Sequence, residues 1–555
     1  MTTSCLLVSD ANIAPLAGYL RNDMESPQVQ VIEAPYGIVE PVFLSEHEIW
    51  SRVDGDTAAL VWTRPHMAVP ALAQLEFGRA VSREELASGV DRFVELLLAK
   101  RDRLSALLLP LWTLPPTARN RGAGDLKRGG CQWAVQQMNA RLVSLAEDSA
   151  LIHLLDTHSM LASCAERVYD AKLWHMGKIP FANSVFRRSV GEVKAVLRAL
   201  TGRAKKLIVL DLDDTLWGGS VGEVGWEQIR LGGHDYVGEA FVAFQQALKG
   251  LSSRGIILAL ASRNEERLAL EAIDSHPDMV LRRDDFVAWQ IHWGDKATSV
   301  ASLAAELNIG LSEVVFIDDH PAERARVREA LPEVMVPEWP EDPALYADAL
   351  AELRAFDALE LSGEDGRRGA LYAEERKRSA SLREVESLEV WLESLELVVT
   401  AKKLMSDDLG RAAQLLNKTN QMNLRTRRMT EDQLASWAEA EGREVWTVRV
   451  ADRFGDAGLC GLLGLKGREG RGDVTDYVLS CRVMGRGVEE ALLYVATVRA
   501  QANGWSSLQV EILPTEKNKP CRAVLERLLA EGKRGENSWD LEGVFPLPQH
   551  VDMRM

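Results

Sequence analysis

The sequence predicts an α/β protein of three domains joined by a helical connector, and three observations carry this prediction. At 555 residues the chain is longer than a single hydrophobic core supports. Residues 1–200 and 203–345 each alternate short apolar runs with segments of helical spacing, which is the pattern of a parallel sheet covered by helices. Residues 395–555 place shorter strands between helices, an α+β pattern. Residues 346–394, rich in Glu, Arg, Ala and Leu, predict the connector.

Composition narrows the class of protein. Apolar residues make up 46% and charged residues 26% of the chain, as in globular proteins, and the net charge is −17. This charge argues against non-specific binding to nucleic acid or anionic membranes. No apolar run reaches the ~20 residues of a membrane helix, and the N-terminus lacks the features of a signal peptide. The six cysteines are scattered, which predicts neither disulfides nor a zinc site and favours a cytoplasmic location.

The N-terminal domain is expected to be a parallel α/β domain. Its predicted strands are 5–9, 58–62, 107–112 and 151–155, and its longest predicted helices are 83–104 and 132–146. Ser9 closes the first strand, where an SGNH-type hydrolase has its nucleophilic serine. Such hydrolases also need a late Asp-x-x-His, and Asp156-Thr-His158 has the wrong spacing. We therefore expect an SGNH-like scaffold or docking domain without chemistry of its own.

The most informative stretch is the apolar run 207–210, which predicts a buried strand and is followed by Asp211, Asp213 and Thr215. In an open parallel sheet, ligands bind at the carboxyl ends of the strands. Two carboxylates two residues apart can divide the work there, one attacking a phosphorus atom and the other moving a proton. The alternative interpretation is a strand followed by an ordinary acidic turn.

Three further groups support the phosphoryl-transfer interpretation. Ser262 ends a second apolar run and can donate to a phosphoryl oxygen, while Lys296 begins a predicted helix and can neutralise transition-state charge. Asp318 and Asp319 end another buried strand and can hold Mg²⁺. Each group alone also fits a structural role: a helix cap, a surface charge or an Asx turn. Together, in this order, they favour a phosphotransferase.

This set of four motifs resembles the haloacid-dehalogenase-like phosphotransferases. The resemblance implies that Asp211 is the nucleophile that forms an aspartyl-phosphate and that Asp213 is the general acid/base. The other implied roles are phosphoryl binding by Thr215, Ser262 and Asn264, charge stabilisation by Lys296, and Mg²⁺ binding by Asp211, the backbone carbonyl of Asp213, Asp318 and Asp319. The short interval between Ser262 and Lys296 leaves no room for a large cap domain. Such an open site suits a bulky, protein-borne substrate.

Further motifs are similar to those of the FkbH-like family. They are residues 173–180, 212–219, 221–225, 276–281, 316–324, 417–428, 452–458 and 480–489. What this family implies is a bifunctional enzyme of polyketide-type biosynthesis. It takes a phosphoglyceryl group from 1,3-bisphosphoglycerate, removes the phosphate, and delivers a D-glyceryl thioester to the phosphopantetheine arm of an acyl carrier protein. The open alternatives are a phosphatase alone, with the C-terminal domain as a docking module, and a non-catalytic scaffold.

The C-terminal domain contributes a phosphate-binding motif. Arg482, Gly485 and Gly487 have the R-x-x-G-x-G spacing of GNAT-type acyltransferases, and backbone N–H groups at the following helix start can hold a phosphate of coenzyme A or of phosphopantetheine. Cys481 directly precedes this loop, where a lowered thiol pKa would let it carry an acyl group. The alternative for Cys481 is a small buried residue.

Two positions complete the predicted site. Asn417 and Asn420 belong to a polar cluster that either faces the acyl group or marks an ordinary helix-to-loop transition. The chain also departs from the FkbH-like pattern, because Ala261 stands where the family has a cysteine. Covalent acyl loading at that position is therefore not expected here.

Overall fold

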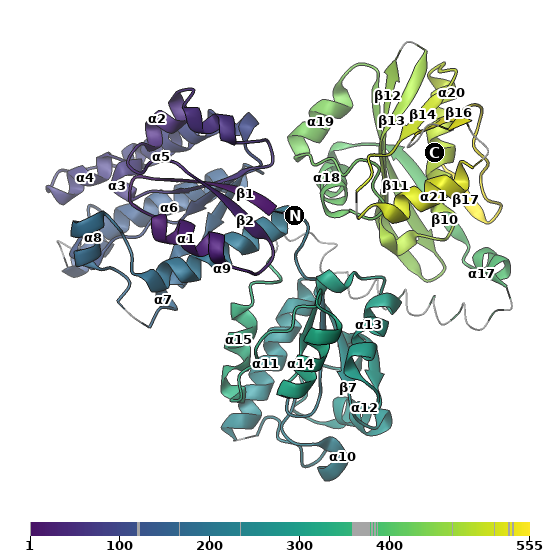
Figure 1. Ribbon diagram of the computed structural model, residues 1–555, viewed down its shortest axis with the longest axis horizontal. Coiled ribbons are helices and arrows are strands. Elements are labelled where there is room, and N and C mark those ends of the chain that lie inside the picture. Colours follow the sequence, from purple (N-terminus) through teal and green to yellow (C-terminus); the bar gives the residue numbers. More distant parts are fainter. Residues whose placement is uncertain are drawn as a thin grey trace. The chain divides into compact units, whose positions relative to one another are not determined.

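The computed structural model is shown in Figure 1. The structure describes residues 2–555 except 119–121, 166, 234, 358–373, 375–377, 379, 380, 382–384, 386, 469, 516, 531, 532 and 535–537. The chain divides into two compact units, one of residues 1–200 together with Asp357 and the other built on residues 201–356 and 360–555. The second unit contains two sheets, which we describe as the central domain (203–345) and the C-terminal domain (395–555); the division of this unit into separate domains stays a prediction. Most of the predicted connector 346–394 lies outside the described residues, and its described ends form α15 (Tyr346–Glu352) and α17 (Leu388–Ser394).

The first unit is a five-stranded parallel sheet in the order β2-β1-β3-β4-β5. Its strands are β1 (Thr2–Ser9), β2 (Gln28–Glu33), β3 (Ala58–Trp62), β4 (Ala106–Pro110) and β5 (Ile152–Leu155). The strands are mostly continuous apolar runs because both faces of the sheet are covered. The predicted α/β organisation is confirmed, whereas the likeness to SGNH hydrolases stays a prediction.

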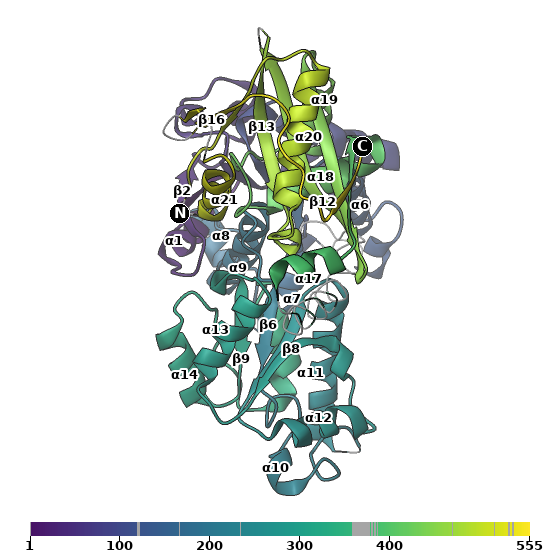
Figure 2. The same ribbon diagram turned by 90° about the vertical axis from the view of Figure 1, so that its right-hand side faces the viewer.

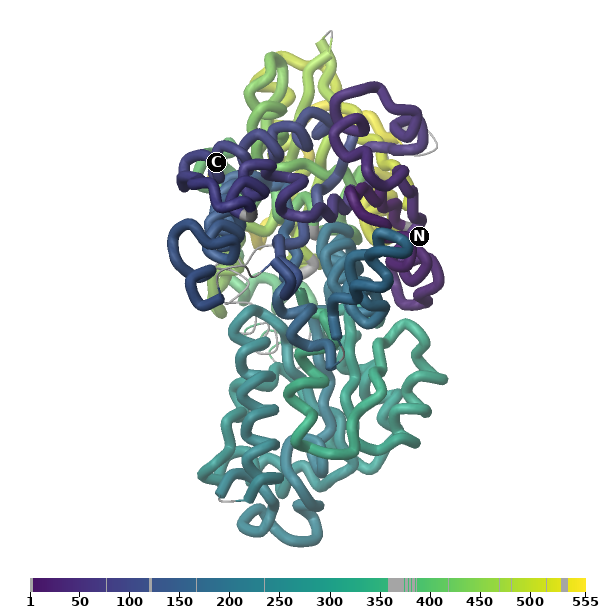
Figure 3. The backbone as a smooth tube through the Cα atoms, turned by 90° about the vertical axis from the view of Figure 1, so that its left-hand side faces the viewer, coloured from purple at the N-terminus to yellow at the C-terminus, as the bar shows by residue number. Residues whose placement is uncertain are grey.

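Helices cover both faces of this sheet (Figures 1 and 3). Leu6 packs toward α5 (Arg83–Leu98) and α6 (Cys131–Glu147), while Leu7 packs toward α1 (Ala14–Asn22) and α9 (Asn183–Leu200). The shorter helices are α2 (Val39–Leu44), α3 (Pro65–Ala68), α4 (Ala71–Glu76), α7 (Thr157–Ala162) and α8 (Ala171–Gly177). Adjacent side chains of β1 thus enter different cores, as the alternation of a strand requires.

The central domain has a four-stranded parallel sheet in the order β8-β7-β6-β9. Its strands are β6 (Leu207–Leu210), β7 (Ile257–Ser262), β8 (Phe286–Ile291) and β9 (Val314–Ile317). The helices are α10 (Val221–Val224), α11 (Tyr236–Ser253), α12 (Glu266–Ser275), α13 (Lys296–Glu306) and α14 (Pro321–Ala330). Figure 2 shows the sheet between α11 and α12 on one side and α13 and α14 on the other.

The C-terminal domain has an eight-stranded sheet in the order β15-β16-β14-β13-β12-β11-β10-β17. Its strands are β10 (Leu397–Lys403), β11 (Arg443–Asp452), β12 (Gly455–Arg468), β13 (Arg471–Leu479), β14 (Leu508–Glu511), β15 (Lys533–Arg534), β16 (Ser538–Leu541) and β17 (Val551–Arg554). One face packs on α20 (Val488–Ala502) and α21 (Lys519–Leu528), the other on α18 (Leu409–Lys418) and α19 (Glu431–Glu439). The predicted α+β organisation is observed.

Within the described part of the chain, no helix combines the length and the apolar character needed to span a membrane.

Candidate active site

The carboxyl edge of the central sheet brings the predicted residues together. Strands β7, β6 and β9 are neighbours, so Ser262, Asp211 and Asp318, which end or directly follow them, lie at one edge. Lys296 is the first residue of α13, and Asp295 caps that helix by accepting the N–H of Thr298. The cap fixes where the helix begins and therefore where the lysine stands.

Lys296 connects two of the aspartates. Its Nζ lies 2.7 Å from Asp211 Oδ2 and 2.6 Å from Asp318 Oδ2. All three side chains are buried. Burial alone would lower the pKa of Lys296, but the charges and hydrogen bonds of Asp211 and Asp318 raise it above its ordinary value. The lysine is therefore a fixed positive charge between the predicted nucleophile and a predicted metal ligand.

The aspartates at this edge fit a divalent cation. One carboxylate oxygen each from Asp211, Asp318 and Asp319 lies within 4.8 Å of the others, and Asp211 Oδ1 is buried with no hydrogen-bond partner among the described residues. Burial and the charge of Asp211 raise the pKa of Asp318 to about 6, although Lys296 acts in the opposite direction. Burial also raises the pKa of Asp319. Lys296 supplies one positive charge to these three carboxylates, and a hard ion such as Mg²⁺ with oxygen ligands would supply the further positive charge.

The Asp213 carboxylate is held in place by hydrogen bonds from its neighbours. Its Oδ1 accepts the indole N–H of Trp217 at 2.9 Å and the backbone N–H of Val221 at 3.1 Å. Its Oδ2 accepts the amide of Asn264 at 3.0 Å. Burial raises the pKa of Asp213 more than these hydrogen bonds lower it, so its pKa lies above the ordinary value. A carboxyl group with a raised pKa suits acid/base work.

Two further predicted residues of the central domain, Thr215 and Ser262, are buried near the aspartates. Thr215 is fully buried, donates its hydroxyl to Asp319 Oδ1 and accepts the Asp319 N–H, both at 3.2 Å, so it orients Asp319. Its role in binding the phosphoryl group stays a prediction. Ser262 is buried at the end of β7. Sequence reasoning missed Arg324, whose guanidinium donates to the backbone carbonyls of Asp318 and Asp319. The role of Trp217 in holding Asp213 was missed as well.

The cap over this site is small, as the sequence predicts. Gly218 and Arg230 exchange backbone hydrogen bonds of 3.0 and 2.8 Å, which closes a short flap. The flap contains only the single-turn helix α10, and the chain then enters the long core helix α11. Access of a bulky substrate to the aspartates stays a prediction.

The R-x-x-G-x-G loop lies between β13 and α20, as predicted, but other residues of the chain already form hydrogen bonds with part of it. Gly485 and Gly487 have left-handed φ values of 75° and 87°. The Gly485 N–H donates to the buried Glu489 carboxylate at 2.7 Å. His550 Nε2 bonds the Arg486 carbonyl at 2.9 Å and lies against Gly487. Arg482 Nε donates to Ser480 Oγ at 3.1 Å. The side chain of Cys481 lies outside what the structure describes.

The side chains of the predicted polar cluster form hydrogen bonds within the chain itself. The Asn417 amide exchanges two hydrogen bonds with Met429, and Asn420 Oδ1 accepts a guanidinium N–H of Arg428. Beyond residue 474, β13 parts from β14, and residues 422–424 fill the gap by bonding the backbone of residues 477 and 479. These contacts agree with the helix-to-loop alternative, and the roles of Asn417 and Asn420 toward an acyl group stay predictions.

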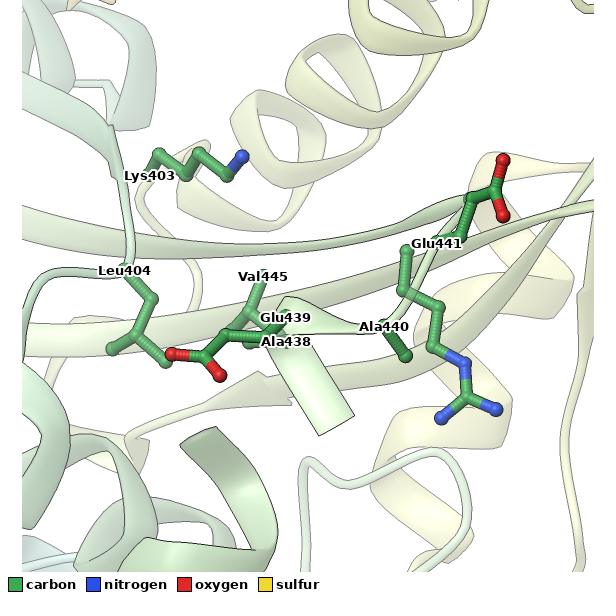
Figure 4. A pocket seen from close by; sticks show the side chains of 9 residues that line it. Lys403, Leu404, Ala438, Glu439, Ala440, Glu441 and Val445 are labelled. Carbon is green, nitrogen blue, oxygen red and sulfur yellow. The ribbon is translucent and has the colours of Figure 1, made fainter. Parts of the chain in front are cut away.

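A surface pocket of about 350 Å³ lies elsewhere in the C-terminal domain (Figure 4). Lys403, Leu404, Val445 and residues 438–443 line it. It contains none of the predicted site residues.

Comparison with known proteins gives a structural relative. No protein-family model and no curated protein matches the chain. The structure is similar to the N-terminal part of a Bacteroides fragilis protein containing a phosphatase domain, crystallised with Mg, at 26% identity and a TM-score of 0.56 over 65% of this chain and 95% of that one.

The chain is also similar to the Escherichia coli ribosomal-protein-S18-alanine N-acetyltransferase, at 12% identity and a TM-score of 0.20 over 27% of this chain and 96% of that one. A further match is an IAA acetyltransferase of Bacillus cereus, at 16% identity and a TM-score of 0.18, which covers 23% of this chain and 73% of that one. The Bacteroides structure supports a phosphatase-type α/β domain and agrees with the predicted use of Mg²⁺.

Proposed function

We propose that this chain is a Mg²⁺-dependent phosphatase coupled to acyl transfer, a glyceryl-S-acyl carrier protein synthase. The observation that carries the phosphatase half is the buried Asp211–Lys296–Asp318 arrangement with Asp319 beside it. The FkbH-like motifs support the glyceryl half. The substrates would be 1,3-bisphosphoglycerate and the phosphopantetheine thiol of an acyl carrier protein.

The positions of the side chains support the following phosphatase step. A carboxylate oxygen of Asp211 attacks the phosphorus of the phosphoglyceryl group, and the bond from phosphorus to the glyceryl oxygen breaks. Asp213 gives its proton to that leaving oxygen. Lys296, 2.7 Å from the nucleophile, balances the charge of the phosphoryl oxygens.

The second half of this step regenerates the enzyme. Asp213, now a carboxylate, takes a proton from water as the water oxygen attacks the phosphorus of the aspartyl-phosphate. The bond between phosphorus and Asp211 breaks, and inorganic phosphate leaves. Mg²⁺, held by Asp211, Asp318 and Asp319, would supply positive charge to the phosphoryl oxygens.

In the acyl-transfer step, the carrier thiol attacks the acyl carbon of 1,3-bisphosphoglycerate. A carbon–sulfur bond forms, the acyl phosphate leaves as inorganic phosphate, and the thiol proton passes to solvent. The Arg482–Gly487 loop would receive the phosphate of the pantetheine arm.

A second candidate is favoured by the C-terminal domain itself. Glu489 occupies the N–H of Gly485, and residues 422–424 fill the gap between β13 and β14. An acyl-transfer site there would need these groups to move. The chain would then be a Mg²⁺-dependent phosphatase acting on a phospho-acyl carrier or a small phosphate ester, with the C-terminal domain as a docking module.

One experiment separates the candidates. The protein is incubated with Mg²⁺, 1,3-bisphosphoglycerate and a phosphopantetheinylated carrier, and the carrier is followed by intact mass. A glyceryl adduct supports the bifunctional enzyme, and a phosphoglyceryl adduct with Asp211→Asn assigns dephosphorylation to Asp211. Asp214→Asn, whose side chain accepts the Gly219 N–H in the flap, is a matched control.

The remaining outcomes are equally decisive. Phosphate release from a pre-loaded phosphoglyceryl carrier, without any loading from 1,3-bisphosphoglycerate, would favour the second candidate. Absence of both products would contradict both enzymatic candidates.

A further inference from the structure

The carboxyl edge of the N-terminal sheet carries a second group of charged side chains. The chain passes from β1 outward to β2 and returns to β3 on the other side of β1, so the switch point of the sheet lies between β1 and β3. Open parallel sheets bind ligands at such a point. Asp10 and Asn12 follow β1 there, and Arg64 follows β3.

Arg64 is held in place by a buried carboxylate. Asp10 Oδ1 accepts the Arg64 backbone N–H at 2.8 Å, and Asp10 Oδ2 accepts Arg64 Nε at 2.6 Å. The guanidinium carbon lies 4.5 Å from the ring centre of Trp174. Across the residues described, the two terminal nitrogens of Arg64 make no hydrogen bond. They are therefore donors that are oriented but unused.

Lys178 reaches the same ring from the end of α8. Asn12 fixes this turn, because its side chain donates to the Gly177 carbonyl at 3.1 Å and its backbone N–H donates to the Lys178 carbonyl at 2.9 Å. Lys178 has a left-handed φ of 55°. Its Nζ lies 5.1 Å from the ring centre of Trp174 and forms no ion pair with any described residue.

We propose that Arg64 and Lys178 form an oxyanion-binding site for the phosphate or carboxylate group of a small metabolite. Two positive charges lie at one tryptophan, and the nearby Asp10 carboxylate already uses both oxygens on Arg64. Guanidinium and ammonium groups are the donors that bind phosphate and carboxylate most strongly. This proposal does not rest on the phosphatase activity.

The site binds its ligand without hydrolysing it. Ser9, which ends β1, is buried, donates its hydroxyl to the Trp62 carbonyl at 2.6 Å and accepts the Ala11 N–H at 3.0 Å. Asp156 caps α7 through the N–H of Ser159 and accepts that residue's hydroxyl. Neither group is arranged as a nucleophile with a base.

The test uses the full chain labelled with 5-fluorotryptophan, in EDTA so that Mg²⁺ does not draw the probes to the aspartate site. Inorganic phosphate, D-glycerate and 3-phosphoglycerate are titrated separately, and the ¹⁹F resonance of Trp174, assigned with Trp174→Phe, is followed. We expect a saturable shift with at least one probe. Arg64→Gln and Lys178→Gln should each weaken binding about tenfold or more.

Arg187→Gln is the matched control, because Arg187 also lies over an aromatic ring, 5.4 Å from the centre of Tyr19, in the same unit. It should leave the affinity unchanged. Arg64→Gln removes a partner of buried Asp10, so Lys178→Gln keeps the test decisive if Arg64→Gln fails to fold. No saturable shift with any probe, an affinity insensitive to Lys178→Gln, or equal weakening by Arg187→Gln would overturn the proposal.

Discussion

The central and N-terminal domains both place charged side chains at the carboxyl edge of a parallel sheet, but the predominant charge is negative in the central domain and positive in the N-terminal domain. Both have parallel sheets whose polar residues gather at the carboxyl edge. In the central domain, three aspartates cluster together and a lysine pairs with two of them. In the N-terminal domain, one aspartate positions an arginine, and this arginine and a lysine both lie near the ring of Trp174. The architecture sets where a site lies, and the side chains set its charge.

The difference has a functional consequence. An excess of buried carboxylates is stabilised by a bound cation, and it provides a nucleophile for phosphoryl transfer. An excess of oriented cations without a free nucleophile can only bind an anion. The two domains are thus expected to differ in their response to metal and to have pH dependences of stability of opposite sign.

The largest expected effect comes from Lys296→Met in the central domain. The change leaves Asp211 and Asp318 buried without their shared cation, and breaking such a pair typically costs about 3–5 kcal/mol. We expect this loss in chemical denaturation with EDTA. Excess Mg²⁺ should restore much of it, because the ion binds the folded state.

Lys249→Met is the control for this prediction. Lys249 pairs with Asp285 at 2.6 Å, and its side chain is 47% exposed. Loss of an exposed pair costs about 1 kcal/mol or less and should not respond to Mg²⁺. If Lys296→Met lowered the free energy of unfolding as little as this control, Lys296 would not be needed to offset the repulsion between the buried aspartates.

The two domains should also differ in the sign of their pH dependence. Burial lowers the pKa of His153 in β5 from 6.5 to about 4, so the unfolded chain binds a proton in this interval that the folded chain does not. His153 therefore contributes stability above pH 6.5 that is lost as the pH falls toward 4, by roughly 2–3 kcal/mol. The pKa of Asp318 is raised from 3.8 to about 6, so its unfavourable contribution grows as the pH rises through that interval.

Variants separate these opposite contributions. His153→Phe should become more stable than the wild type as the pH falls from 7 to 4.5. Asp318→Asn should gain stability over the wild type, in EDTA, as the pH rises across the same range. His158→Phe, at an exposed position of the same unit, is the control. Equal slopes for all variants in denaturation experiments would contradict the predicted difference.

The sequence predicts strands of continuous apolar residues well and strands of mixed composition poorly. Strands β3, β6 and β9 appear as unbroken apolar runs because helices cover both faces. Strand β2, Gln28–Glu33, alternates with polar residues, and β17 lies near the C-terminus. β17 pairs with a strand about 150 residues earlier, and such long-range pairing leaves no local signal.

The residues of the candidate active site also differ in how well the sequence predicts them. Asp211, Lys296 and Asp318 were predictable because strand ends and a helix start fix their backbone. Glu489 was not, because its contact with Gly485 depends on a side-chain rotamer within the first turn of α20. For Trp217, the position four residues after Asp213 was the one available signal.

A smaller effect tests how the central edge positions its acid/base. Trp217→Phe removes the N–H that holds Asp213 Oδ1 at 2.9 Å but keeps the buried aromatic ring. We expect kcat for phosphate release to fall about tenfold with little change in KM. Trp289→Phe is the matched control, because its N–H bonds the exposed Glu266 at 2.8 Å. Equal kinetics of the two variants would remove Trp217 from the positioning of Asp213.

The smallest effect is expected from Ser9→Ala, which tests whether the N-terminal edge lacks chemistry of its own. Ser9 ties β1 to β3 through Trp62, so its removal should lower the free energy of unfolding by about 1 kcal/mol. Phosphate release should be unchanged, and neither protein should hydrolyse p-nitrophenyl acetate above background. An esterase activity that disappears in Ser9→Ala would make the N-terminal edge a second catalytic site. Retained function with the small loss of stability would leave Arg64 and Lys178 as the groups there that act on a ligand.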